Sequence, residues 1–273
     1  MRRLGYLLFL GVALLLALVP VYWLATIALK REVDQFAVPP VWFAFTPTLA
    51  HYREIFFVRP FAPYLWNSAV VAAVSTLLAL ALGTPAAYAL ARFRFPYRLE
   101  ERLSFWILST RMFPPIVSVV PLFLLMHRLD LLNSRAALIL IYTSFNLPLV
   151  VWMMRSFVAE VPPELEEAAM VDGHSRLGAL VKVVLPLAAP GLAATAVFCL
   201  IFAWNEFLFA LVLTQTEAAM TLPVGIAGQV TQYEIKWGAM SAAGVVAMVP
   251  VLVFAFLAQK YLVRGLSLGA VKG

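Results

Sequence analysis

The chain has 273 residues, of which 63% are hydrophobic and only 12% are charged. Soluble globular domains carry about a quarter charged residues, so this composition excludes an ordinary soluble domain and indicates an integral membrane protein. The formal net charge is +6, but the basic residues lie between apolar runs, where Lys and Arg orient membrane helices, so we expect no nucleic-acid partner.

Six stretches are apolar over the roughly 20 residues that a membrane-spanning helix needs. The first follows Arg2 and Arg3 as in a signal peptide. It is too long for the apolar part of a signal peptide and has no convincing cleavage site, so we expect a retained signal anchor. The fold class is predicted to be all-α, with one transmembrane domain over residues 1–273. The six spans cover about residues 4–29, 64–91, 103–126, 136–158, 187–213 and 241–263.

The distribution of basic residues predicts the orientation of these spans. With the N-terminus inside, twelve of the 20 Lys and Arg residues fall in inner segments, seven fall in outer segments, and Arg111 lies within a span. An excess of Lys and Arg marks the cytoplasmic side. We therefore expect both termini in the cytoplasm, with residues 30–63 and 214–240 forming the larger outer loops.

Several predicted spans contain residues that interrupt helices or carry polar groups. Ordinary proline kinks in a packed bundle and the lining of a pathway both remain open, although several kinked helices together favour a protein that moves or encloses a pathway. The interrupting residues are Gly83, Pro85, Pro114, Pro115, Pro121, Pro148 and Pro250, and the polar ones are Arg111, Asn146, Asn205 and Glu206.

The intramembrane charges Arg111 and Glu206 have two readings. Along ideal helices they would lie about 7 Å apart along the membrane normal, so a direct ion pair would need tilt or a long reach. Trp204, Asn205 and Glu206 place an aromatic ring beside hydrogen-bonding groups, a combination that suits carbohydrate. We expect mainly packing roles, with a pore contact as the alternative.

Reactive and metal-binding constellations are not evident. Cys199 is the only cysteine, and His51, His127 and His174 are far apart and lack metal-ligand spacing. The sequence has no GxSxG, HExxH or GxxxxGK[ST] motif. We therefore expect neither an enzyme nor an ATP-binding subunit, and no cofactor or metal on this chain.

The loop at 159–186 is unusually polar for its surroundings. Pro162 and Pro163 suit the start of a helix, and Glu164, Glu166 and Glu167 fall where the positive end of the helix dipole stabilises acids. Helical spacing places Leu165, Ala168, Ala169 and Asp172 on one small, smooth face, and Gly173 stands where a left-handed cap would end the helix. Ser175 is predicted to cap a second helix with an apolar stripe of Leu177, Leu180, Val181 and Val184.

This loop resembles the cytoplasmic signature of bacterial ABC-importer permeases. That signature reads Glu-Ala-Ala, three residues, Gly, nine residues, Ile, one residue and Leu-Pro, and Val183 stands here for the isoleucine. "FAWNEFLFALVLT" (202–214) and "YLVRGLSLGAVKG" (261–273) narrow the resemblance to the carbohydrate-uptake, maltose-type group with a short N-terminus. The matching residues are Glu167, Ala168, Ala169, Gly173, Leu185 and Pro186.

The resemblance implies a type I importer permease in a bacterial or archaeal plasma membrane. Such a chain forms half of a heterodimeric pore with a second permease and receives a sugar from an extracytoplasmic binding protein. Its signature loop seats on a dimer of ATPase subunits that bind the ATP and Mg²⁺. The implied coupling residues are the six above with Glu166 and Asp172, and tail residues Gly269, Lys272 and Gly273 are implied to reach the ATPase. In relatives the pore site lies mainly on the partner permease, and the segment matching residues 214–240 probes the binding protein.

Other classes remain as alternatives. A permease for amino acids, peptides or phosphate would share the loop, whereas a channel or an intramembrane enzyme would not explain it.

Overall fold

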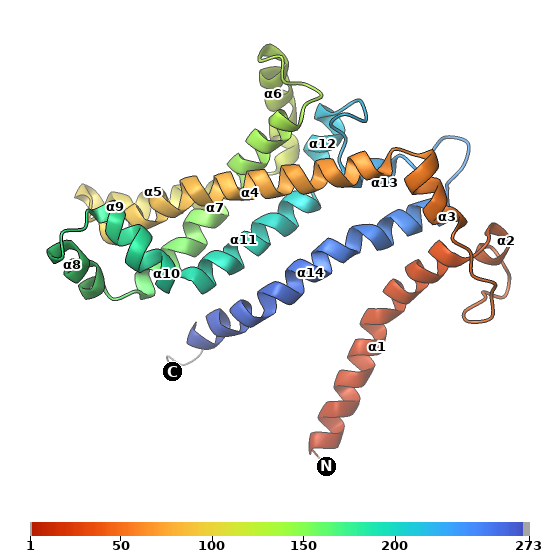
Figure 1. The fold of residues 1–273 in the computed structure, drawn as a ribbon, viewed down its shortest axis with the longest axis horizontal. Helices are drawn as coiled ribbons and strands as arrows, with labels where there is room; N and C mark the ends of the chain where they lie inside the picture. The colour runs from red at the N-terminus through yellow and green to blue at the C-terminus, as the bar shows by residue number, and fades with distance from the viewer. Residues whose placement is uncertain (1, 270–273) are drawn as a thin grey trace. The chain divides into compact units, whose positions relative to one another are not determined.

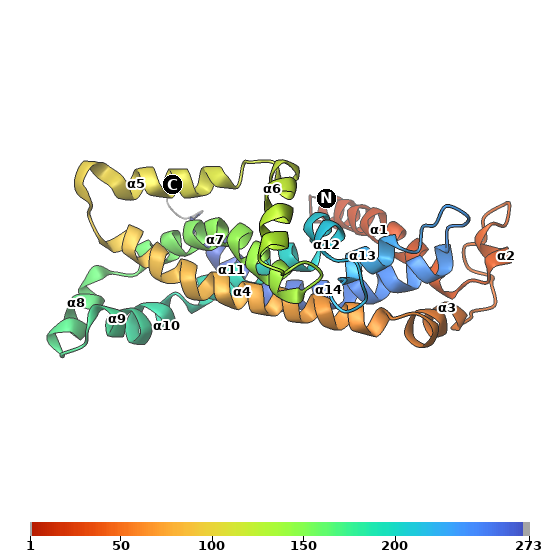
Figure 2. The same ribbon diagram turned by 90° about the horizontal axis from the view of Figure 1, so that it is seen from above.

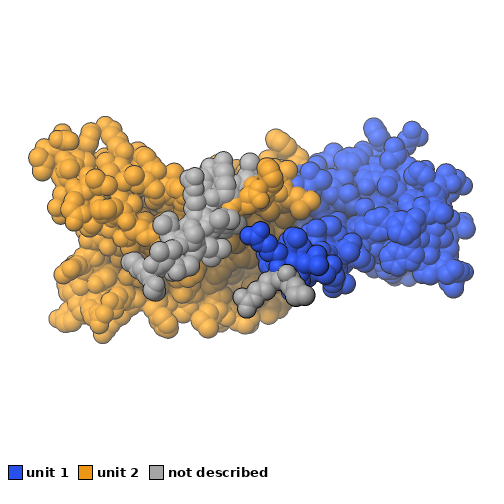
Figure 3. Space-filling model, turned by 90° about the horizontal axis from the view of Figure 1, so that it is seen from below, with its two compact units in different colours: residues 1–65, 221–250 blue, residues 66–220, 251–273 orange. Residues whose placement is uncertain are grey.

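The computed structural model describes residues 2–269, and the described residues are helical with connecting loops (Figure 1). They form two compact units, residues 1–65 with 221–250 and residues 66–220 with 251–273 (Figure 3). The helices are α1 (Arg2–Leu29), α2 (Glu32–Gln35), α3 (Ala50–Arg53), η1 (Glu54–Val58), α4 (Phe61–Arg92), η2 (Pro96–Arg98), α5 (Leu99–Thr110), α6 (Pro115–Arg128), α7 (Arg135–Glu160), α8 (Pro163–Val171), α9 (Arg176–Ala179), η3 (Leu180–Val184), α10 (Leu185–Leu187), α11 (Ala189–Trp204), α12 (Leu208–Leu213), α13 (Leu222–Ala227) and α14 (Trp237–Gly269).

Four of these helices are long and apolar enough to cross a membrane, and up to six spans result if each of two bent helix pairs counts as one. The continuous helices α1, α4, α7 and α14 contain the predicted first, second, fourth and sixth spans. The chain is thus a multi-pass membrane protein.

The predicted third span, 103–126, is not one straight helix. The chain turns through 88° between the segment Pro96–Thr110, which includes α5, and α6, a break that Figure 2 shows clearly. Pro114 and Pro115 explain the break, because Pro disfavours the α conformation before it and removes a backbone donor. In contrast, Pro85, Pro148 and Pro250 lie inside continuous helices and do not end them.

The predicted fifth span, 187–213, is also divided. Helix α11 ends at Trp204 and α12 begins only at Leu208. At its other end, α11 meets the segment Arg176–Leu187 at 81°. The apolar run of the sequence therefore begins at a sharp bend and continues past the end of α11.

The first unit holds α1, whose apolar window has no buried residues. Leu8, Phe9 and Leu15 of this helix are each more than 60% exposed, as lipid-facing residues are. At its end, the Lys30 carbonyl accepts a hydrogen bond from His51 Nε2 at 2.9 Å. The His51 ring in turn packs on Gly238, where a Cβ atom would lie 2.2 Å from ring atom Cε1.

The second unit is built around α7, of whose apolar window 61% is buried. Helices α4 and α11 pack on it through small residues, which lets backbones approach closely in membrane bundles. A Cβ atom at Gly83 would lie 2.7 Å from Val150 Cγ1, and one at Gly191 would lie 2.1 Å from Phe157 Cγ. The core beside them contains Ala79, Ala87, Leu149, Val150, Met154, Ala188 and Cys199.

Candidate functional site

Helix α8 has the start and the end that its sequence predicts. Pro162 is its N-cap residue and Pro163 its first helical residue. At its end, the Gly173 amide donates to the Met170 carbonyl at 3.1 Å and the His174 amide donates to the Ala169 carbonyl at 3.0 Å. These two bonds make a Schellman motif, which requires a left-handed residue, and Gly173 has φ of +89°.

The second half of the loop is less regular than predicted. The Ser175 hydroxyl accepts the Gly178 amide at 3.1 Å, so the predicted cap is confirmed. After one turn of α9 the chain forms a π-helical turn, η3. Leu180 and Val184 are buried, but Leu177 and Val181 are 66% and 54% exposed. Only half of the predicted apolar stripe is therefore covered within this chain.

The predicted small face of α8 divides in the same way. Leu165, Ala168 and Asp172 are exposed, whereas Ala169 is 7% exposed and turned inward with Glu166. Three-residue spacing places Ala169 and Glu166 on one side of the helix. Of the predicted coupling residues, Glu167, Ala168, Asp172, Gly173 and Pro186 are exposed, and Leu185 is partly buried.

Glu166 is held inside the protein by two side chains from the end of α4. Its Oε1 atom accepts from Arg92 Nε at 2.5 Å, and its Oε2 atom accepts from Tyr88 Oη at 2.9 Å. The Arg92 Nη2 group also donates to the Val161 carbonyl at 2.6 Å. The Arg92 and Glu166 side chains are 10% and 6% exposed. Sequence reasoning missed Arg92 and Tyr88, since nothing in their local pattern indicates a partner 70 or more residues away.

An apolar cluster lies beside this ion pair and joins the loop to the spans. Leu185 of the signature is partly buried against the cluster, which gives this residue a packing position. A second contact comes from α9, where the Arg176 guanidinium lies 5.1 Å from the centre of the Phe93 ring. The buried members of the cluster are Tyr88, Val158, Val161, Leu180 and Val184.

The second group of predicted polar residues surrounds the break between α11 and α12. Tyr142 Oη donates to Glu206 Oε2 at 2.5 Å, and the backbone amides of Phe209 and Ala210 donate to the same carboxylate. Glu206 thus satisfies the free amides at the start of α12. A carboxylate in this position is stabilised by the helix dipole as well as by hydrogen bonds.

Arg111 and Glu206 form no ion pair among the contacts of the described residues. The Arg111 guanidinium lies 4.5 Å from the centre of the Phe202 ring and donates to the Phe145 carbonyl at 3.3 Å. Both charged residues line a cavity of about 250 Å³, and Tyr142 and Asn146 also line it.

The other three residues predicted for this group make one local contact and two contacts with residues far away in the sequence. Asn146 donates to the Cys199 carbonyl at 3.4 Å, and Asn205, which is exposed, donates to the Ile201 carbonyl at 2.8 Å. Trp204 is buried and its ring meets Phe254 edge-on at 6.4 Å.

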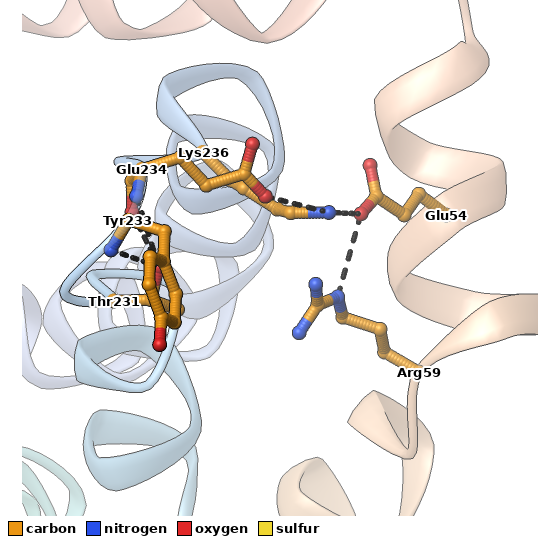
Figure 4. A network of polar contacts seen from close by, with 6 residues as sticks. All are labelled: Glu54, Arg59, Thr231, Tyr233, Glu234 and Lys236. Carbon is orange, nitrogen blue, oxygen red and sulfur yellow. Dashed lines mark hydrogen bonds and ion pairs between the residues drawn. The ribbon is translucent and has the colours of Figure 1, made fainter.

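The loop at 229–236 closes on η1 through a charged network (Figure 4). Glu54 Oε1 accepts from Lys236 Nζ at 3.2 Å and from Arg59 Nε at 3.3 Å. Burial alone would raise the pKa of Glu54, but the hydrogen bonds and charges of Lys236 and Arg59 outweigh it and lower that pKa. Thr231 caps the loop by accepting the Tyr233 and Glu234 amides. Glu54 and Lys236 also border a cavity of about 680 Å³.

The predicted tail contacts lie at the limit of the structure. Gly269 is the last residue of α14, and Lys272 and Gly273 lie outside the described residues.

These features define a multi-pass membrane protein that carries a short exposed helix on a loop between two spans. Comparison with known proteins identifies its family. Residues 79–268 match the model of the family described as the binding-protein-dependent transport system inner membrane component, and the chain belongs to this family. It is therefore a permease subunit of the ABC-importer type and not an enzyme.

Relatives and solved structures agree with this assignment. The chain is 41% identical over 263 residues to the sulfoquinovosyl glycerol transport system permease protein of Agrobacterium fabrum, covering 96% of this chain and 92% of that one. It is 38% identical over 262 residues to the trehalose/maltose transport system permease protein of Thermococcus litoralis, covering 95% and 93%. Among solved structures, a bacterial ABC transporter involved in the import of the acidic polysaccharide alginate matches with a TM-score of 0.78 and 25% identity, over 95% of this chain and 96% of that chain.

Proposed function

We propose that this chain is the membrane-spanning subunit of an ABC importer for a sugar or oligosaccharide. Relatives that match nearly its whole length are named for transport of sulfoquinovosyl glycerol and of trehalose and maltose. In the proposed assembly it forms one half of the pore beside a second permease, and an extracytoplasmic binding protein delivers the solute. ATP is hydrolysed by separate cytoplasmic subunits, to which the 162–186 loop couples the pore.

The exposed face of α8 is the observation that carries the coupling assignment. Leu165, Ala168 and Asp172 project from a nine-residue helix, which is too short to be stable alone in water. Its inward side is fixed by Glu166 and Ala169, so the outward side is presented in one orientation. A small side chain at Ala168 permits close approach by a partner surface.

A substitution at Ala168 tests this assignment. The tagged chain is expressed in the cell that makes it, and the ABC ATPase retained on purification in mild detergent is quantified. Ala168→Trp is expected to abolish retention, because the indole would hold the docking surfaces apart. Ala168→Ser at the same position is the matched control and should retain the ATPase. Equal retention by both variants would refute docking through this face.

Uptake measurements test the solute class. Cells with and without the gene are given labelled mono- and oligosaccharides, amino acids, peptides and phosphate. The proposal expects loss of uptake of one saccharide only. Loss of amino acid, peptide or phosphate uptake would favour the alternative, a permease for a non-sugar solute.

In this proposal Arg111 and Glu206 stabilise the packing of the broken spans and do not bind the solute. Glu206 is occupied by Tyr142 and two backbone amides, and Arg111 by an aromatic ring and a carbonyl. These contacts support packing of the broken spans rather than solute recognition.

A further inference from the structure

The link between α7 and α8 is only two residues long. Helix α7 ends at Glu160 and α8 begins at Pro163, so Val161 and Pro162 alone join them. Val161 has extended backbone dihedrals, φ −76° and ψ 125°, and lies outside both helices. A short extended link of this kind could act as a hinge, unless other contacts fix α8 to the spans.

Arg92 supplies those contacts, one to the link itself and one to α8. It is the last residue of α4, and its guanidinium bonds both the Val161 carbonyl and the Glu166 carboxylate. The link and the first turns of α8 are thereby held to the end of a third helix. The planar guanidinium suits this role, because its donors lie in a fixed fork that a Lys ammonium does not reproduce.

The helix ends reinforce the ion pair. Arg92 lies in the last turn of α4, where the helix dipole favours a cation, and Glu166 lies in the first turns of α8, where it favours an anion. Both carboxylate oxygens are occupied, one by Arg92 and the other by Tyr88. Glu166 is thus turned away from the exposed face of α8 and fully used within the chain.

We propose that Glu166 is a positioning residue, which with Arg92 and Tyr88 locks α8 to the ends of α4 and α7 so that the three move as one body. The inference rests on the proposed function, in which a partner acts on α8. A displacement of α8 is then passed directly to α4, and the 161–162 link does not absorb it. We call the contacts of Glu166 with Arg92 and Tyr88 the lock. The buried apolar cluster of Val158, Val161, Leu180 and Val184 lies beside the lock but contributes no directional bond.

A distance measurement across the lock tests this proposal. Spin labels are placed at Arg94 and Val171, both exposed, in a Cys199→Ser background, and their distance is measured by double electron–electron resonance. The purified chain is measured alone and with its co-purified ATPase, in Mg²⁺-ATP with and without vanadate. The labelled chain that keeps Glu166 should give one narrow distance distribution that vanadate does not shift.

Glu166→Gln should broaden that distribution in the free chain and make it shift with vanadate, while the ATPase is still retained. The matched control, Glu167→Gln, removes the neighbouring exposed carboxylate and should keep the narrow, unshifted distribution. Tyr88→Phe removes one hydrogen bond and should give intermediate broadening, so it also tests the lock if Glu166→Gln does not reach the membrane.

Narrow, unshifted distributions in Glu166→Gln and Tyr88→Phe would overturn the lock, and so would a vanadate-dependent shift in the Glu166 chain itself. Failure of the Glu166 chain to retain an ATPase would instead contradict the proposed function. In that case the width of the distance distribution in the chain without ATPase would still test whether Glu166 fixes α8 to α4.

Discussion

The Arg92 guanidinium and the Glu166 carboxylate meet at 2.5 Å across 74 residues of sequence. Arg92 is the last residue of α4 and Glu166 lies in the first turns of the exposed helix α8, so this contact connects a membrane-spanning helix with the exposed loop. Its burial makes the pair sensitive to loss of either partner, because a lone charge would remain poorly solvated.

Removing one member of this pair is expected to cost more than removing both. Arg92→Gln or Glu166→Gln alone should each lower the free energy of unfolding by about 3 kcal/mol. The double variant should lose less than the sum, because two amides can share a hydrogen bond and no buried charge is left. Unfolding in mixed micelles with increasing dodecyl sulfate measures all four chains. Additive losses would show that the two side chains do not act together.

Replacement of Gly173 should impair coupling without removing the protein from the membrane. A Cβ atom at Gly173 would meet nothing within 4 Å, so the cost is backbone strain of about 1 kcal/mol or more at φ +89°. Gly173→Val should insert at normal levels yet lose ATPase retention or response. Gly173→Asn is the control, because Asn tolerates the left-handed region. Immunoblots of membranes and ATP hydrolysis by the complex check this, and normal hydrolysis in Gly173→Val would contradict it.

Gly83 is expected to be intolerant of any side chain. A Cβ atom there would lie 2.7 Å from Val150 Cγ1, so Gly83→Ala forces α4 and α7 apart at a cost of about 1–3 kcal/mol. Gly11→Ala adds the same methyl group where nothing lies within 4 Å and should be neutral. Thermal unfolding in detergent compares the two variants. Equal melting temperatures would mean that the α4–α7 contact can relax without cost.

The network around Glu54 should weaken in acid. Lys236 and Arg59 hold the pKa of Glu54 below its usual range despite burial. The stability that this group contributes is therefore present above its ordinary pKa and is lost as the pH falls through the lowered value. Hydrogen exchange of residues 229–236 should accelerate over that acidic range. Glu54→Gln should exchange at a rate independent of pH after correction for intrinsic exchange, and a Glu54 chain without acid acceleration would contradict the assignment.

The predicted orientation can be checked with single cysteines. In a Cys199→Ser background, Cys at Gln232 should react with an impermeant thiol reagent on intact cells, whereas Cys at Lys182 should react only after permeabilisation. Both positions are exposed, so accessibility reports the side of the membrane. The reverse pattern would place both termini outside.

Local backbone chemistry made some features of the loop predictable from sequence. The Gly173 turn and the Ser175 cap depend on residues within five positions of each other, and both form as expected. The apolar runs likewise predicted where the long helices α1, α4, α7 and α14 lie, because a bilayer demands about 20 apolar residues per span.

The prolines in the spans do not by themselves predict which helices break. Pro85, Pro148 and Pro250 lie within continuous helices, whereas Pro114 and Pro115 accompany a turn of 88°. The sequence marks both kinds of site with the same residue. Neighbouring helices can stabilise a helix through one proline, and two consecutive prolines remove more backbone bonds than packing restores.

The sequence by itself determined that this is a multi-span membrane protein with a capped, glycine-terminated helix in its polar loop. Tertiary structure decided which side of that helix faces outward. Helical spacing places Leu165, Ala168, Ala169 and Asp172 on one face and also puts Ala169 three residues from Glu166, but it does not say where the covered side begins. Arg92 and Tyr88 determine which side is covered, because the buried Glu166 carboxylate is stable only where hydrogen-bond donors from α4 reach it.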